Sequence, residues 1–303
     1  MSVKNECDEP EDVFRKRAAE FLAKGIHSDM TFIVGLEDDS AETFKAHKLL
    51  LAIGSEVFEA MFYGELSEKG VVRVTDLHPD GFRGILGYIY KGSLQASTIL
   101  EALYTRHAAQ KYMIRYLLKL CNEYINENLD TGNVCQVMDH EIGGSDFEES
   151  ITSILERNIE KVLESSAFIV ATEATVHRIL RTSNLSVSES DLVCSLYAWA
   201  RAKCSREADS PTELQDRPVR VIQESDIFTP YLPGKTETEK QIRCALDPFL
   251  REIRLLDLTP DEFIDGPLAW NVFSDEEALS ILANLIRKGS MQLPSFCRSV
   301  DKL

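Results

Sequence analysis

The sequence predicts an α+β domain followed by an all-α domain. Over about the first 125 residues, short segments with apolar residues at every second position are interleaved with helical segments. After that point, apolar residues recur at helical spacing in one segment after another. A chain of 303 residues is long enough for two domains. We therefore place the domain boundary near residues 128–131.

The α+β part begins with a helix and a pair of strands. Residues 1–12 are polar and acidic and predict a disordered tail. A helical stripe starts at Val13 and ends at Gly25, a residue type that commonly terminates helices. Residues 28–35 then alternate as in a strand, and a second strand is predicted at 43–47 after an acidic loop.

The next segments alternate between helix and strand. The run at 48–54 is apolar on all sides, which predicts a buried helix. Ser55 suits the N-cap of a helix that ends at Gly64, and residues 71–74 predict a third strand. Pro79 begins the following helix.

The rest of the chain predicts helices, apart from one segment. Three capping boxes mark helix starts: Thr98 with Glu101, Thr259 with Glu262, and Ser274 with Glu277. Gly289 closes the last helix. Residues 206–240 contain four prolines and little periodicity, which predicts a long loop inside the helical half.

The composition argues against several classes of function. The chain has 50 acidic and 33 basic residues, a formal net charge of −17, so its surface repels nucleic-acid phosphates and anionic membranes. No apolar run approaches the ~20 residues that span a bilayer, and the acidic N-terminus is unlike a targeting signal. Seven cysteines without Cys-x-x-Cys spacing favour reduced thiols in the cytosol or nucleus.

The sequence contains none of the common catalytic motifs. It lacks Gly-x-Gly-x-x-Gly, a phosphate-binding loop and a nucleophile elbow. None of the six histidines is paired at local metal-ligand spacing with another histidine or a cysteine. We therefore predict no catalytic residue, no metal site and no cofactor.

Two parts of the chain resemble known families. "SD" before the first strand, "AHKLLLA", "SEVFEAMF" and a Phe followed by an Ile-Tyr pair are similar to a BTB/POZ domain. "LSVSESDLVCSLYAWARAKC" and "REIRLLDLTPDEFIDGPL" resemble the BACK domain of BTB–BACK–PHR proteins, which are adaptors of cullin-RING ubiquitin ligases. The resemblance implies a BTB/POZ domain at 13–128 and a BACK domain at 129–300.

The resemblance also implies a homodimer, whose two-fold interface combines the first helix with the helix after the second strand. The residues implied for this interface are Phe14, Phe21, Leu22, Leu49 and Leu50. Burial within the chain's own core is the alternative for them. Asp29 and Lys48 match a charged pair near the dimer seam. His47 is then a structural residue that is hydrogen-bonded in the core.

Cullin-binding members of the family carry an apolar-x-Glu motif after the Ser-x-x-Phe helix. Leu66 and Glu68 match this motif, in which a small apolar plug lies beside an orienting charge. An ordinary loop anchor is the alternative role for Leu66. We expect exposed aromatic side chains to extend the cullin-binding surface: Phe62, Tyr63, Tyr104 and Tyr112.

Three features depart from the family pattern. The chain ends at Leu303, so we expect it to lack the PHR domain, which binds substrates. Residues 105–107 look inserted within a helix, and three residues turn a helix by about 300°, which predicts a bulge or break. Residues 206–240 include an insertion of roughly 25 residues. These departures indicate either a variant isoform or an imperfect gene model.

These predictions lead to three possible functions, which we rank in order. The first is a non-enzymatic, cytosolic homodimeric adaptor that joins a cullin-3-type scaffold to an unidentified substrate protein. The alternative is a dimerisation scaffold that pairs with related BTB proteins and, without a substrate domain, acts as a dominant-negative short form. A transcriptional co-regulator ranks third, because no DNA-binding domain is visible. Neither nucleic acid nor a membrane is an expected partner.

Overall fold

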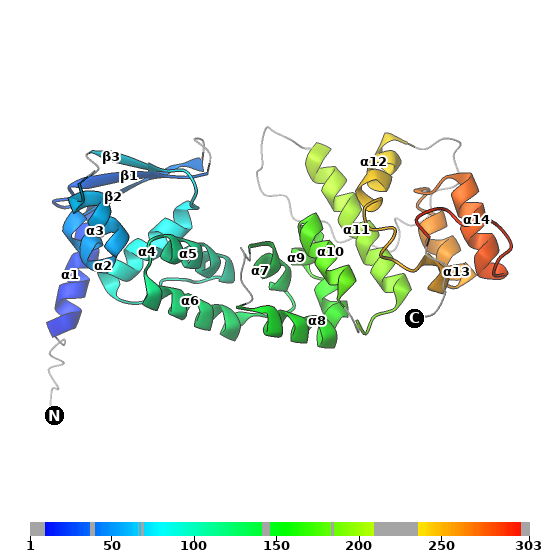
Figure 1. Ribbon diagram of the computed structural model, residues 1–303, viewed down its shortest axis with the longest axis horizontal. Helices are drawn as coiled ribbons and strands as arrows, with labels where there is room; N and C mark the ends of the chain where they lie inside the picture. Colours follow the sequence, from blue (N-terminus) through cyan, green and yellow to red (C-terminus); the bar gives the residue numbers. More distant parts are fainter. Residues whose placement is uncertain are drawn as a thin grey trace, which may run out of the picture. The chain divides into compact units, whose positions relative to one another are not determined.

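The computed structural model describes most of the chain. The described residues are 10–36, 40–65, 67, 70–140, 146–182, 185–208 and 236–297. The chain divides into two compact units, Met1–Ser150 and Ile151–Leu303. Figure 1 shows the helices and strands of each unit.

The first unit contains a three-stranded mixed sheet. β1 (Met30–Val34) is the central strand, antiparallel to β2 (Glu42–Ala46) and parallel to β3 (Val71–Val74). These strands confirm the three that the sequence predicts. Alternation along β1 buries the side chains of one face: Met30, Phe32 and Val34.

Seven helices are described in this unit, and they lie on one side of the sheet (Figure 1). They are α1 (Pro10–Lys24), α2 (Lys48–Gly54), α3 (Glu56–Tyr63), α4 (Pro79–Lys91), α5 (Ile99–Lys111), α6 (Arg115–Asn128) and α7 (Val134–His140). α1 begins at Pro10 rather than Val13, so the end of the expected disordered tail is helical. Residues 1–9 lie outside the described residues.

The predicted helix boundaries are satisfied by local hydrogen bonds. Ser55 Oγ accepts the N–H of Phe58 at 3.3 Å, as an N-cap should. The boxes at Thr259 and Ser274 are complete. At α5 the hydroxyl of Thr98 accepts the N–H of Glu101, while the carboxylate of Glu101 accepts the N–H of Ser97 at 2.7 Å, one residue earlier than predicted.

Aromatic side chains fill the centre of the first unit. The ring of Phe58 stacks on that of Tyr112, with centroids 4.1 Å apart, and the rings of Phe32 and Phe82 lie 4.8 Å apart. All four side chains are almost completely buried. Such aromatic pairs add about 0.5–1.5 kcal/mol each beyond the burial of their area, so this cluster holds the sheet against α3, α4 and the end of α5.

The prediction that residues 48–54 form a buried helix is wrong. The segment is helical as α2, but Leu51 is its one fully buried residue. Leu49 is 62% exposed and Ile53 is 75% exposed. α2 packs on α3 and α4 through one face, so the apolar residues on its other face meet solvent.

The predicted bulge or break at residues 105–107 is also wrong, because α5 continues through them as a regular helix. Thr105 and Arg106 lie in the interior, where they are 1% and 8% exposed. Arg106 donates to Asn122 Oδ1 at 2.7 Å, pairs with Asp146, and lies over the ring of Phe147. These partners compensate for the removal of the guanidinium group of Arg106 from water.

Thr105 yields a prediction about stability. Its buried hydroxyl has no hydrogen-bond partner among the described residues. A buried unsatisfied hydroxyl destabilises a protein by about 1–3 kcal/mol, and valine has nearly the same shape without it. We expect Thr105→Val to raise the free energy of unfolding by about 1 kcal/mol, measured by urea denaturation followed by circular dichroism. Thr98→Val removes an exposed capping hydroxyl and should destabilise instead. A loss of stability in Thr105→Val would contradict the assignment.

Every regular element described in the second unit is a helix, which confirms the predicted all-α half. Its elements are α8 (Glu148–Leu163), α9 (Ser166–Ile169), α10 (Glu173–Arg181), α11 (Glu189–Ala208), α12 (Glu237–Leu246), η3 (Leu255–Asp257), α13 (Pro260–Phe263), η4 (Ile264–Leu268) and α14 (Asp275–Ile286). Trp199 in its core donates to the carbonyl of Ala171 at 2.8 Å. Of the predicted loop at 206–240, both ends are helical and residues 209–235 lie outside the described residues.

Candidate protein-interaction surfaces

His47 has a structural role, as predicted. Its Nε2 lies 2.7 Å from the carbonyl oxygen of Ile26, which can only accept, so Nε2 carries the proton. Its Nδ1 then accepts the hydroxyl of Tyr90 at 2.7 Å, and the same hydroxyl accepts the backbone N–H of His47 at 2.9 Å. Burial raises the pKa of Tyr90 to about 12. This network fixes the passage from β2 into α2.

Asp29 and Lys48 meet beside this network, but through the backbone. The carboxylate of Asp29 accepts the N–H of Lys48 at 2.8 Å, which caps the first turn of α2. The ammonium group of Lys48 lies 5.7 Å from the centroid of the Phe62 ring. The two residues are therefore in contact without the side-chain ion pair that the resemblance implies.

We group the exposed apolar residues Phe14 on α1 and Leu49 and Ile53 on α2 with the half-buried Tyr88, and we call them the α1–α2 face. Phe14 is 65% exposed, and it borders a hollow of about 570 Å³ together with Tyr88 and Gly54, the residue after Ile53. Leu49 and Ile53 lie one helical turn apart on α2. Exposed apolar side chains gathered in this way are typical of protein–protein contacts.

The predicted dimer residues divide between this face and the core. Phe14 and Leu49 belong to the face, whereas Leu22 and Leu50 are half-buried against the core of their own chain. Phe21 is half-buried and packs on the rings of His27 and His47. Ile53 is the residue that the sequence reasoning missed. Its spacing of four from Leu49 on an all-apolar helix is the signal that indicates it.

The residues expected to bind a cullin differ in their exposure to solvent. Tyr63, at the end of α3, is 59% exposed. Tyr104 is half-buried and stacks on His78, with ring centroids 3.9 Å apart. Leu66 and Glu68 lie outside the described residues.

Two of the expected exposed aromatics are core residues instead. Phe62 is 5% exposed and Tyr112 is 1% exposed. The ring of Phe62 packs on Phe32 beneath the sheet, and Tyr112 stacks on Phe58. Helical spacing places Phe62 on the same face as Phe58, one turn earlier, and that face meets the sheet.

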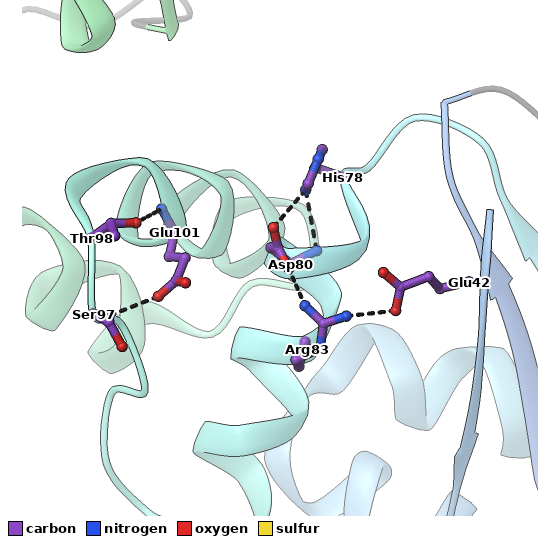
Figure 2. Close-up of polar contacts among 7 residues, drawn as sticks. All are labelled: Glu42, His78, Asp80, Arg83, Ser97, Thr98 and Glu101. Atoms are coloured by element: carbon purple, nitrogen blue, oxygen red, sulfur yellow. Dashed lines mark hydrogen bonds and ion pairs between the residues drawn. The ribbon is translucent and has the colours of Figure 1, made fainter. Parts of the chain in front are cut away.

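A chain of polar contacts crosses from α4 to β2 in the same unit (Figure 2). Arg83 on α4 pairs with Asp80 one turn earlier and with Glu42 on β2. The N–H of Asp80 is accepted by Nδ1 of His78 at 3.2 Å, so His78 caps α4. These contacts tie the edge of the sheet to α4 and form one wall of a groove.

The titratable groups described here carry structural roles. Burial raises the pKa of the Cys121 and Cys135 thiols to about 12, so neither is a nucleophile at neutral pH. In the second unit, Glu252 holds both His177 and Arg181, and Arg243 forms two hydrogen bonds with Glu277. Across the described ranges, no group of His, Cys, Asp and Glu is arranged to hold a metal ion.

Comparison with known families supports a binding role for the first unit. The model for the BTB/POZ domain matches residues 19–129. This part of the chain is a BTB/POZ domain. BTB/POZ domain-containing protein 6-A of Danio rerio is 29% identical over 272 residues, which cover 88% of this chain and 45% of the relative. BTB/POZ domain-containing protein 6 of Mus musculus is 31% identical over 272 residues, which cover 88% of this chain and 45% of the relative.

A second BTB/POZ relative matches a shorter stretch. BTB/POZ domain-containing protein 3 of Homo sapiens is 31% identical over 198 residues, which cover 64% of this chain and 37% of the relative. The chain thus spans less than half the length of these curated relatives. BTB/POZ domains are generally protein-interaction modules, which agrees with the exposed apolar residues of the α1–α2 face and with the exposed Tyr63. No helix in the described ranges is both long and apolar enough to cross a membrane.

Proposed function

We propose that this protein is a non-enzymatic, dimeric adaptor that binds a cullin-3-type scaffold through its BTB/POZ domain. The main support for the dimer is the exposure of the α1–α2 face. Phe14, Leu49 and Ile53 are each more than 60% exposed, and no described part of the chain covers them. A face of this kind suits isologous contact, in which the same patch of two subunits meets itself.

The second interface of the proposal begins at the end of α3. Tyr63 projects there into solvent, and Leu66 and Glu68 follow it within five residues of the chain. Exposed aromatic anchors beside an apolar residue and a charge are typical of binding hot spots. Tyr104 is half-buried, and it is a further candidate for this surface among the aromatic residues that the sequence indicated. We propose that this surface holds the N-terminal domain of a cullin.

The second unit has a matching role in this proposal. We infer that its helices form a BACK domain, which sets the distance between the cullin and a substrate-binding module. The resemblance of residues 185–204 and 251–268 to BACK sequences supports this inference. The chemistry of ubiquitin transfer then belongs to the conjugating enzyme, and this chain acts in the cytosol by holding partners together.

The proposal is tested by retention on an immobilised cullin-3 N-terminal fragment. We expect the wild-type chain to bind and the Leu66→Asp/Glu68→Lys variant to lose at least tenfold in affinity, because an apolar anchor and an orienting charge are both removed. Tyr63→Ala should weaken binding to a smaller extent.

The matched control is Tyr116→Ala, because Tyr116 is 61% exposed on α6 and lies outside the proposed surface. This control should bind as the wild type does. Equal retention of the wild type and Leu66→Asp/Glu68→Lys would refute the motif assignment. No retention of the wild type would refute the adaptor function itself.

A further inference from the structure

A groove of about 660 Å³ runs beside β2, on a part of the first unit that neither proposed interface uses. We call it the β2 groove. Its walls come from the end of α1, strand β2, helix α4 and the segment before α5. Leu22, Phe44 and Leu86 supply apolar lining, and Lys45, Lys91 and Glu101 supply charges. A volume in this range is typical of ligand-binding sites, and more than half of the lining residues are polar or charged, which favours a ligand that offers charge or hydrogen bonds as well as an apolar group.

The groove follows the free edge of the sheet. β2 is an outer strand and pairs only with β1 among the described strands. Successive side chains of a strand point to opposite faces, yet Thr43, Phe44 and Lys45 all line the groove. The groove must therefore border the edge of the strand rather than one face. Edge strands present unpaired backbone groups, which bind extended peptides by adding a strand to the sheet.

Some of the basic side chains that line the groove form ion pairs with acidic residues, whereas others do not. Arg83, at its wall, is paired with Asp80 and Glu42 (Figure 2), and Lys24 is paired with Glu20 at 2.5 Å. Lys45 makes no ion pair with a described residue. Lys91 donates to the neutral amide of Gln95 at 3.0 Å. In a chain of net charge −17, these two lysines are open to an acidic partner.

Glycine in α4 lets a neighbouring segment pack closely against the helix beside the groove. A Cβ atom at Gly87 would lie 2.9 Å from Cγ of Gln95, so the segment that carries Gln95 packs directly on the α4 backbone. Phe44 lines the groove, with its ring 5.3 Å from that of Phe82 and with the guanidinium of Arg83 5.7 Å from its centroid. The apolar lining is therefore anchored in the core, and binding needs little rearrangement.

We propose that the β2 groove binds a short extended peptide in which an acidic residue is close to one large apolar side chain. The peptide backbone lies along the edge of β2. Its apolar side chain packs on Phe44 and Leu22, the two half-buried apolar residues of the groove, and its carboxylate pairs with Lys45 and Lys91. This site is complete within a single copy of the chain, and it does not depend on cullin binding.

The test uses a phage-displayed library of random linear peptides selected on the full chain. We expect the selected sequences to be enriched in Asp or Glu near one large apolar residue. Synthetic copies should bind at least tenfold more weakly to Lys45→Glu/Lys91→Glu, measured by fluorescence polarisation. Lys119→Glu/Lys161→Glu changes the net charge by the same amount at exposed positions outside the groove and should bind as the wild type does.

Two further measurements keep the result unambiguous. Thermal unfolding must be the same for the two charge-reversed variants, so that a loss of binding is not a loss of fold. A benzophenone amino acid placed at Thr43 should cross-link to the bound peptide. The proposal is overturned by failure to select any binder, by selected peptides without acidic residues, by equal affinity for Lys45→Glu/Lys91→Glu, or by peptides that bind only as helices.

Discussion

Replacing both Leu49 and Ile53 with aspartate is expected to convert a dimer of this protein into a monomer. Both side chains are more than 60% exposed on α2 and would be buried against a second copy. Burying one such side chain contributes about 1.5–3 kcal/mol to the free energy of association. In a two-fold dimer each substitution is present in both subunits, so its effect on association is doubled. Aspartate also brings like charges together at the seam. We expect association to weaken at least 100-fold, measured by sedimentation velocity at micromolar concentration.

The control for this experiment is Leu36→Asp. Leu36 is 61% exposed after β1, so the substitution has the same chemistry away from the α1–α2 face. It should leave the dimer intact. Because the replaced side chains are exposed in the single chain, neither variant should lose more than about 0.5 kcal/mol of folding free energy. A wild-type chain that stays monomeric, or a Leu49→Asp/Ile53→Asp variant that stays dimeric, would refute this interface.

Gly84→Ala is expected to destabilise the first unit strongly. A Cβ atom at this position would lie 2.0 Å from Oγ1 of Thr105 and 2.7 Å from its Cγ2. Alanine favours a helix by about 0.5–1 kcal/mol over glycine, but overpacking between two helices costs about 1–3 kcal/mol and occasionally more. At so short a distance we expect a net loss of about 3 kcal/mol, measured by urea denaturation followed by circular dichroism.

The structure supplies both a suppressor and an internal control for this result. Thr105→Ala removes the two nearest clashing atoms, so the double variant should recover part of the lost stability, a coupling that independent sites lack. Both tryptophans, Trp199 and Trp270, lie in the second unit, so their fluorescence transition should not shift. Gly132→Ala, whose new atom meets only the Asp130 carboxylate at 3.3 Å, should be nearly neutral. If the change in unfolding free energy of the double variant equals the sum of the changes in the two single variants, the proposed contact between Gly84 and Thr105 is contradicted.

These predictions depend on different kinds of information. The strands, the helix that starts after Ser55 and the capping boxes follow from the sequence, because alternation and capping are local patterns that act over a few residues. The structural role of His47 follows from its place between β2 and α2 in a recognised pattern. The BTB/POZ domain itself was identified from such motifs.

The tertiary structure alone decided which surfaces are open to partners. Periodicity tells which side chains share a face, but it does not tell which face another element covers. Phe62 and Tyr63 are neighbours of similar character, yet one is 5% exposed and the other 59%, because only Phe62 points beneath the sheet. For the same reason the sequence predicted a buried α2, whereas Leu49 and Ile53 meet solvent. The burial of Thr105 and Arg106 depended on Gly84, Asn122 and Asp146, which are distant in sequence, and the β2 groove on four separate segments. Such contacts join residues far apart in the chain, and no local pattern records them.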